Sequence, residues 1–280
     1  MKYRNPKPPL DRLLEGPSEE ASVELYKLYL AAIESRVDSE EAESRLIARL
    51  VIGVAPHRAL CDKSIAAFSG LELGIVSSWV DDLGSLLYRD HTINGGIRVR
   101  HISILEYLTG RFCPLDFRVD LKQADVELSM YSLQTMMTEL RFNICGLESS
   151  YRSNSEIDNL SERVQENVSD ILQYSCLHWS SHLCSNSDPA SKDTCETLDK
   201  FLRGEYLFYW LEVLSVMSQV PVAIMALRKI IACSRVRKFD DGVVNLAKDV
   251  LRFVLAFITP ISTSAPYIYL SALPFTPSES

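Results

Sequence analysis

His101 is the residue of this sequence best placed to do chemistry, because it stands where a predicted hairpin passes into a predicted helix, in NGGIRVRHISILEYL. Ser103 and Glu106 fit a capping box, and Ile102 with Tyr107 fits a hydrophobic staple. We therefore expect Ser103 to cap a helix, two residues after His101. The unpaired N–H groups and the dipole at a helix start favour an anion, and a phosphate is the obvious candidate. A histidine hydrogen-bonded to a nearby carbonyl is the alternative.

A second group of reactive side chains is Cys176-x-His178-x3-His182-x-Cys184, which contains metal-ligand types in close order. The two histidines are four residues apart and could share an ion. On one helix, however, steps of about 100° per residue place the two cysteines far around the cylinder from the histidines. We therefore predict core packing around Trp179 and no metal site.

Signatures of catalysis are missing from the sequence. No G-x-x-x-x-G-K-[ST] occurs, so no P-loop can cradle a nucleoside triphosphate, and there is no nucleophile elbow. The paired acids Asp81-Asp82 fit a solvated face, and the aromatic residues of 206–210 have the helical spacing of a core. We expect the chain not to be an enzyme, and no catalytic residue is predicted.

Length and composition indicate a folded chain rather than a disordered one. Its 280 residues are 47% hydrophobic and carry a net charge of −8, so the chain as a whole lacks the positive field that nucleic acid or anionic lipid requires. The start has no apolar signal region, and seven cysteines without a repeating spacing favour reduced thiols in a cytoplasmic protein. Residues 253–277 are uncharged, but Pro260, Pro266 and Pro274 argue against a membrane span.

The elements that must position His101 are two short helices and a hairpin. Asp62 can cap a helix ending at Gly70, and the next helix carries apolar residues on one face, namely Val76, Val80, Leu83 and Leu87. The chain then turns at 94–96 and returns as a strand in which Ile97 and Val99 alternate with arginines. A helix-turn-helix followed by a β-hairpin is a winged helix.

A winged helix often binds DNA through its second helix. Here that helix contains Glu72, Asp81 and Asp82, with no lysine or arginine before Arg89. Phosphates would be repelled by this surface, so DNA binding is the weaker interpretation.

Around the winged helix the sequence pattern is helical. One predicted helix covers 21–37, and a second one ends near residue 54. Further predicted helices cover 121–147, 159–184, 194–219, 222–235 and 242–258. We therefore expect a mainly α fold, with a winged helix followed by a helical bundle or short superhelical array. The predicted divisions are a linker with an N-terminal helix (1–43), the winged-helix domain (44–110), a helical domain (111–259) and an extended C-terminal linker (260–280).

The runs LYKLYLAAIESRV, APHRALCDKSIAAFSG, WVDDLGSLLYRD and GGIRVRHISILEYL resemble the winged-helix part of fungal NACHT proteins of the STAND class, the signalling NTPases related to NOD-like receptors. The resemblance continues through LRFNICGLESS, DILQYSCLHWSSHLC, FLRGEYLFYWLEVLSV and TPISTSAPYIYLSALPFTPS, which covers nearly the whole chain. It implies that His101, at the end of the wing, contacts the β-phosphate of ADP held by a neighbouring NTPase domain. The residues around His101 depart from the Met-His-Asp form of plant and animal relatives.

The resemblance also implies a function: a regulatory module without catalysis, coupling nucleotide state to conformational change. ADP or ATP would bind only with an adjacent NTPase domain, and the partners would be that domain and a WD-repeat propeller. No nucleic acid or membrane partner is expected. The alternatives are a stand-alone helical adaptor that binds proteins, and a non-functional truncated gene product.

Overall fold

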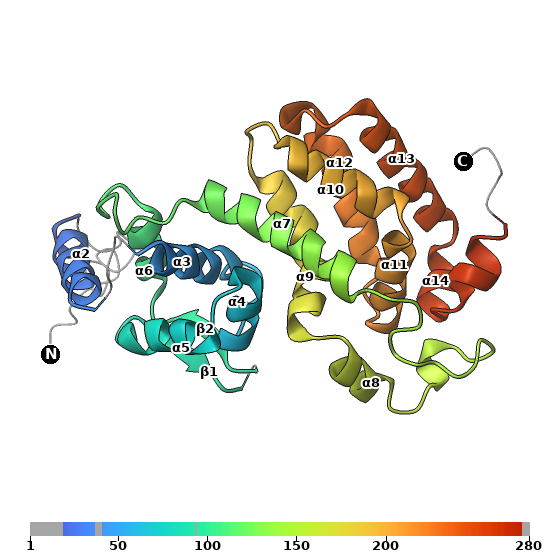
Figure 1. The fold of residues 1–280 in the computed structure, drawn as a ribbon, viewed down its shortest axis with the longest axis horizontal. Coiled ribbons are helices and arrows are strands. Elements are labelled where there is room, and N and C mark those ends of the chain that lie inside the picture. The colour runs from blue at the N-terminus through green and yellow to red at the C-terminus, as the bar shows by residue number, and fades with distance from the viewer. Residues whose placement is uncertain (1–18, 37–40, 93, 276–280) are drawn as a thin grey trace, which may run out of the picture.

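The computed structural model describes residues 19–36, 41–92 and 94–275, and the linker predicted before residue 19 lies outside these ranges. The described chain is mainly helical and elongated, with α2 at one end and α14 near the other (Figure 1). The elements of the N-terminal half are α2 (Glu19–Glu34), α3 (Ala42–Val54), α4 (Asp62–Ser69), α5 (Leu73–Asp82), β1 (Leu87–Asp90), β2 (Gly96–Val99) and α6 (Ile102–Thr109). Those of the C-terminal half are α7 (Leu121–Glu139), a 3-10 turn (Asn154–Glu156), α8 (Leu160–Asn167), α9 (Asp170–Ser185), α10 (Lys192–Arg203), α11 (Tyr206–Val216), α12 (Pro221–Arg237), α13 (Asp241–Ala256), α14 (Ile258–Thr263) and a π-helical turn (Ile268–Ala272).

The predicted winged helix is present, as α3, α4 and α5 followed by the β1–β2 hairpin and α6. Helix α4 ends at Gly70, whose φ of 70° is a left-handed conformation that glycine adopts without steric cost. The strands are antiparallel, with Leu87 opposite Val99 and Asp90 opposite Gly96. Leu87 was expected on the buried face of the second helix, but it opens β1, because α5 already ends at Asp82.

The helical half follows the predicted order with two extra breaks. The stretch predicted as one helix over 159–184 is divided at Ser169, which caps α9 by accepting a hydrogen bond from the N–H of Leu172. The stretch over 194–219 is divided at Gly204, whose extended backbone ends α10. A Cβ atom at this position would lie 2.9 Å from the carbonyl oxygen of Lys200, so glycine suits this conformation. Short helices packed at angles therefore replace the long ones.

The C-terminal segment is not the extended linker predicted for 260–280. Helix α14 and the π-helical turn fold back on the core, and Ile261, Ala265, Ile268 and Ala272 are fully buried. Prolines 260 and 266 lie near the starts of helical segments, where the missing N–H group costs nothing. The last part of the predicted linker, residues 276–280, lies outside the described residues.

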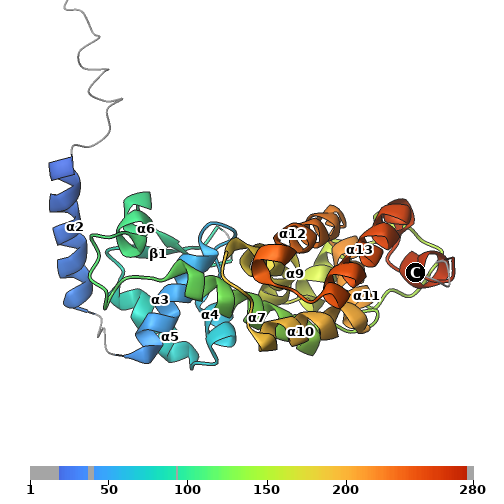
Figure 2. The ribbon, with the colours of Figure 1, turned by 90° about the horizontal axis from the view of Figure 1, so that it is seen from above.

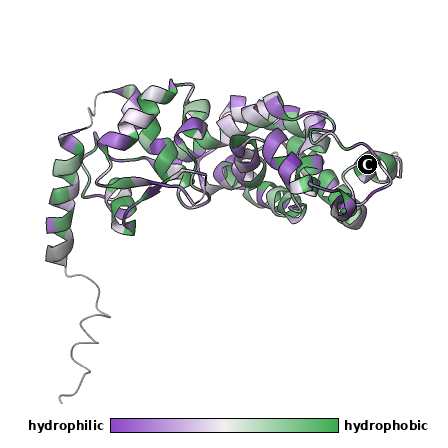
Figure 3. Cartoon of the chain, turned by 90° about the horizontal axis from the view of Figure 1, so that it is seen from below, coloured by the Kyte–Doolittle hydropathy of each residue, from purple (hydrophilic) through white to green (hydrophobic). Residues whose placement is uncertain are grey.

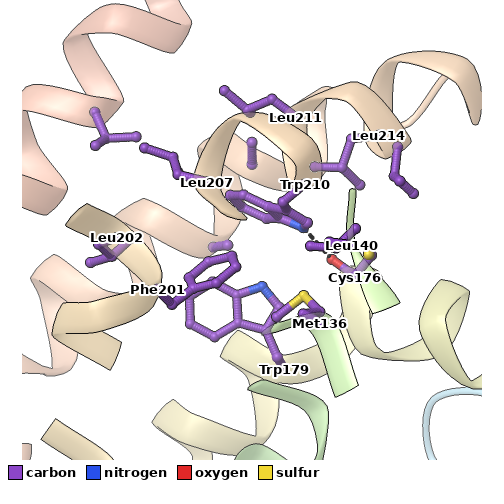
Figure 4. Close-up of a cluster of buried hydrophobic side chains, with 14 of the residues drawn as sticks. Met136, Leu140, Cys176, Trp179, Phe201, Leu202, Leu207, Trp210, Leu211 and Leu214 are labelled. Carbon is purple, nitrogen blue, oxygen red and sulfur yellow. Dashed lines mark hydrogen bonds between the residues drawn. The ribbon is translucent and has the colours of Figure 1, made fainter. Parts of the chain in front are cut away.

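Two hydrophobic clusters hold the chain together. One fills the winged helix, and the other fills the helical half around three aromatic rings, those of Trp179, Phe201 and Trp210 (Figure 4). Their centroids lie 5.4 to 5.8 Å apart in edge-to-face arrangements, which suit the aromatic quadrupole. Hydrophobic and hydrophilic residues alternate along the helices in Figure 3, as amphipathic helices that share a core require.

Helices α7 and α9 connect the two halves. They pack side by side (Figures 1 and 2). Both carry side chains that belong to the winged-helix cluster, Leu128 on α7 and Tyr174 on α9. Arg49 of α3 also makes a two-pronged ion pair with Glu127 of α7, at 2.8 Å for each nitrogen–oxygen contact. No helix of the described residues is long and apolar enough to cross a membrane.

Candidate functional site at the end of the hairpin

His101 lies directly after the hairpin and is itself the cap of α6. Pairing continues past β2 through the N–H of Arg100, which donates to the carbonyl of Leu86 at 2.8 Å. The extended backbone of His101 then places its ring over the first turn, where Nδ1 accepts a hydrogen bond from the N–H of Ser103 at 3.2 Å. His101 as a residue is exposed to solvent. The position expected for an anion-contacting histidine is therefore accessible.

The expected capping box at Ser103 is wrong in detail. The helix begins at Ile102, and Ser103 lies inside its first turn with its hydroxyl 2.6 Å from Nδ1 of His101. Ile102 is 60% exposed and forms no staple with the buried Tyr107. The imidazole accepts the N–H of Ser103, which the capping box would have paired with the side chain of Glu106, and the helix starts earlier.

The hydrogen bonds of His101 assign a direction to its ring. Nδ1 accepts the backbone N–H of Ser103, so in the neutral ring the proton sits on Nε2. Ser103 Oγ is also 2.7 Å from the hydroxyl of Tyr29, a buried residue of α2. These contacts hold the Nδ1 side of the ring against α6. They leave the N–H group at Nε2 as a donor for an acceptor on another molecule.

Arginines of the hairpin are mostly engaged. Arg89 pairs with Asp62 and Asp81, and hydrogen bonding to these carboxylates raises its pKa. Arg98 lies 2.9 Å from Asp90, and Arg100 donates through Nε to the carbonyl of Gly84. Helix α5 carries no basic residue, so the winged helix presents little free positive charge for a phosphate backbone.

A cavity of about 200 Å³ lies behind α6, between α3, α5 and the chain entering α7. Its walls are mainly apolar and include Ile104 and Leu108 of α6. The indole Nε1–H of Trp79, which also lines it, is buried without a hydrogen-bond partner.

Away from the hairpin, the histidines of α9 belong to a buried polar network. His182 Nδ1 lies 2.7 Å from Asp125 of α7, and its Nε2 lies 2.6 Å from the hydroxyl of Tyr174. His178 stacks on His57, at 5.0 Å between ring centroids. Sequence reasoning missed His57, which is far away in the chain and carries no local signal.

The histidine network does not resemble a metal centre. Cys176 is fully buried, and Cys184 contacts a different cysteine, so neither joins the histidines. In the described part of the chain no group of three or more histidine, cysteine, aspartate or glutamate side chains is arranged to hold an ion. Burial lowers the pKa values of His57 and His178, the latter to about 4, so both rings are neutral near pH 7.

Comparison with known proteins gives a partial match. No family model matches the chain, and no solved structure matches it. The vegetative incompatibility protein HET-E-1 of Podospora anserina is 30% identical over 115 residues, which is 39% of this chain and 8% of that protein. The chain is thus distantly similar to part of a fungal incompatibility protein, and it spans a small fraction of that relative's length.

Proposed function

We propose that this chain is a regulatory module of the NACHT type, which couples the nucleotide state of a neighbouring NTPase domain to a rearrangement of helices. The observation that carries the proposal is the exposed, hydrogen-bonded imidazole of His101 at the junction of a wing and a helix. The partial similarity to an incompatibility protein and the winged-helix fold support it.

The geometry fits a single phosphate contact rather than a complete nucleotide site. His101 offers Nε2–H, while its Nδ1 and the N–H of Ser103 are already used by each other. One donor from this chain can hold a phosphate oxygen of ADP, and the remaining donors would belong to the NTPase domain. A hydrogen bond to a charged group contributes about 1.5–3 kcal/mol, enough to bias a two-state equilibrium by roughly tenfold or more.

The path of coupling runs from the wing to the helical half. With ADP bound, the contact of His101 would favour the closed arrangement of the winged helix against the NTPase domain. Loss of the contact would release the winged helix, and α3 would carry the movement to α7 through the pair of Arg49 with Glu127. Both side chains of this pair are largely buried, so the connection is protected from solvent screening.

The test places this chain behind the NTPase domain of a full-length NACHT protein, in place of the corresponding segment. The release rate of a fluorescent ADP analogue is compared with that of the NTPase domain alone. We expect release to slow by about tenfold when the chain is present, as one added charged hydrogen bond allows. Equal release rates would contradict the proposal and would favour the stand-alone adaptor.

A further inference from the structure

The thiols of Cys184 and Cys233 form an isolated pair between two packed helices. Cys184 is near the end of α9, Cys233 is on α12, and their sulfur atoms lie 2.7 Å apart. A disulfide bond is ~2.05 Å long, so a small movement would join them. Both side chains are partly exposed, which leaves a path for a small reagent.

Positive charge surrounds the pair. Lys229, one turn before Cys233, donates to Ser181 Oγ at 2.8 Å, and Arg237, one turn after it, is buried. The hydrogen bond between the two thiols is the main cause that lowers the pKa of Cys233, and the charge of Arg237 acts in the same direction. The same hydrogen bond raises the pKa of Cys184. One thiolate can therefore form while the second sulfur keeps the proton, and the thiolate is the nucleophilic form.

The other cysteines lack these properties. Cys113, Cys145 and Cys176 are buried, and burial raises the pKa of each thiol. Cys195 is partly exposed, but burial raises its pKa as well. Cys61 is also partly exposed, but its sulfur contacts the hydroxyl of Ser64 and not a second thiol. Disulfide formation by an oxidant is thus expected at the pair of Cys184 and Cys233.

We propose that Cys184 and Cys233 form a reversible disulfide when the chain meets hydrogen peroxide, pinning α9 to α12. The thiolate of Cys233 attacks one peroxide oxygen, giving a sulfenic acid and hydroxide. The sulfur of Cys184 then attacks the sulfenic sulfur and expels a second hydroxide. The protons released by the two thiols convert both hydroxides to water, so two thiols and one peroxide give one disulfide and two water molecules.

The bond would restrain the helical half of the molecule. Residues 184–233 include all of α10 and α11, which supply Phe201 and Trp210 to the aromatic centre of the core. Closing a loop of this length raises the melting temperature of a domain of this size by on the order of 5–10 °C. Oxidation would therefore stiffen the part of the chain that lies beyond the winged helix.

The experiment treats the full reduced chain with hydrogen peroxide below its melting temperature, unfolds it in guanidinium chloride so that every remaining thiol is alkylated, and maps the peptides by mass spectrometry. We expect two of the seven cysteines to resist alkylation, in a crosslinked peptide pair containing Cys184 and Cys233. Dithiothreitol should restore both thiols and remove the rise in melting temperature.

Matched variants separate the pair from the background. Cys195→Ser should form the crosslink as the unchanged chain does, whereas Cys184→Ser and Cys233→Ser should lose it. If a variant folds poorly, the peptide map of the unchanged chain still shows whether Cys184 and Cys233 become crosslinked. Seven freely alkylated cysteines after peroxide, or a crosslink between any other two cysteines, would overturn the proposal.

Discussion

The histidines show how far a side chain's surroundings decide its chemistry. His101 caps a helix at the surface, whereas His182 is buried between Asp125 and Tyr174 and serves the core. The residue type is the same, but the exposed ring can meet a ligand and the buried ring cannot. Accessibility therefore separates the candidate site from the structural histidines.

Acid should weaken the fold through His178. Burial lowers its pKa from 6.5 to about 4, and the charges of His57 and His182 act in the same direction, as do the cations Arg58 and Lys229. Between these two pKa values the unfolded chain binds a proton that the folded chain does not, so the free energy of unfolding falls as pH decreases through this window. The expected loss is roughly 1–2 kcal/mol, allowing for the partial exposure of the ring. At His57, whose pKa burial also lowers, the carboxylate of Asp125 opposes the lowering.

The measurement is urea unfolding of the unchanged chain and of His178→Gln at pH values on either side of this window. The variant should show a smaller difference between the two conditions, while His91→Gln, an exposed histidine of the hairpin, should behave as the unchanged chain does. An unaltered pH dependence in His178→Gln would contradict the assignment.

Replacing Trp179 and Trp210 should lower the free energy of unfolding by different amounts. Trp210 donates through Nε1 to the carbonyl of Cys176 at 2.9 Å, whereas the Nε1–H of Trp179 is buried without a partner. Replacement by phenylalanine removes a similar volume at both sites, but only Trp210→Phe also loses a hydrogen bond. We expect Trp210→Phe to reduce the free energy of unfolding by about 1 kcal/mol more than Trp179→Phe. Equal losses in chemical denaturation would show that the hydrogen bond contributes nothing.

At the residue scale the sequence located the candidate histidine but not its role in the helix. Ser103 looked like the cap because serine is a common capping residue, and nothing local shows that the imidazole of His101 accepts the N–H of Ser103. The network of His57, His178 and His182 could not be predicted, since it depends on the packing of α9 against the loop after α3. Only the spacing of four residues between His178 and His182 was visible.

Helices α3 and α7 pack closely where the winged helix meets the helical half. Gly53 allows it, because a Cβ atom at this position would lie 2.7 Å from Leu128 Cδ1 and 3.2 Å from Ala124 Cβ. A larger side chain would force the helices apart and open the winged-helix cluster on that side.

Gly53→Leu should therefore lower the free energy of unfolding by about 2–3 kcal/mol, in a thermal or urea experiment. Gly74→Ala is the matched control, since Gly74 lies in α5 with open space around its Cβ position and should gain up to about 1 kcal/mol from helix propensity. A harmless Gly53→Leu would mean that α3 and α7 are not held this closely in solution.

Helix order followed from the hydrophobic period, but helix ends did not. Ser169 and Gly204 break helices that the apolar pattern alone would continue, because that pattern contains neither a serine cap nor the extended backbone of a glycine. The tail containing Pro260 and Pro266 was predicted as a linker from its composition. It folds because four of its apolar or small side chains find space in the core, which is a tertiary effect.

At the scale of the whole molecule, the two hydrophobic clusters are linked by continuous helices. Leu128 and Tyr174 contribute to the winged-helix cluster, while Leu133 of α7 and Cys176 of α9 contribute to the other. Because α7 and α9 run through both, one cluster cannot lose its packing without exposing the other. Such shared helices would be needed if a movement of the winged helix is to reach the helical half.

Heating should therefore unfold the chain in one transition. Calorimetry should give a van't Hoff enthalpy close to the calorimetric enthalpy, and near- and far-ultraviolet circular dichroism should share one midpoint. Two separated transitions would show that the winged helix and the helical half are independent, and coupling through α7 and α9 would then have no basis.

We propose that His101 holds a nucleotide phosphate, and two substitutions separate this role from helix capping. His101→Ala removes both the cap and the Nε2–H donor, whereas His101→Asn keeps a good capping side chain and removes the imidazole. The decisive measurement is the dissociation rate of ADP from the NTPase domain joined to this chain, with His91→Asn as the control on the same hairpin. We predict that both His101 variants release ADP about tenfold faster, with no change in the control. An unchanged rate in His101→Asn would reduce His101 to a helix cap and contradict the account.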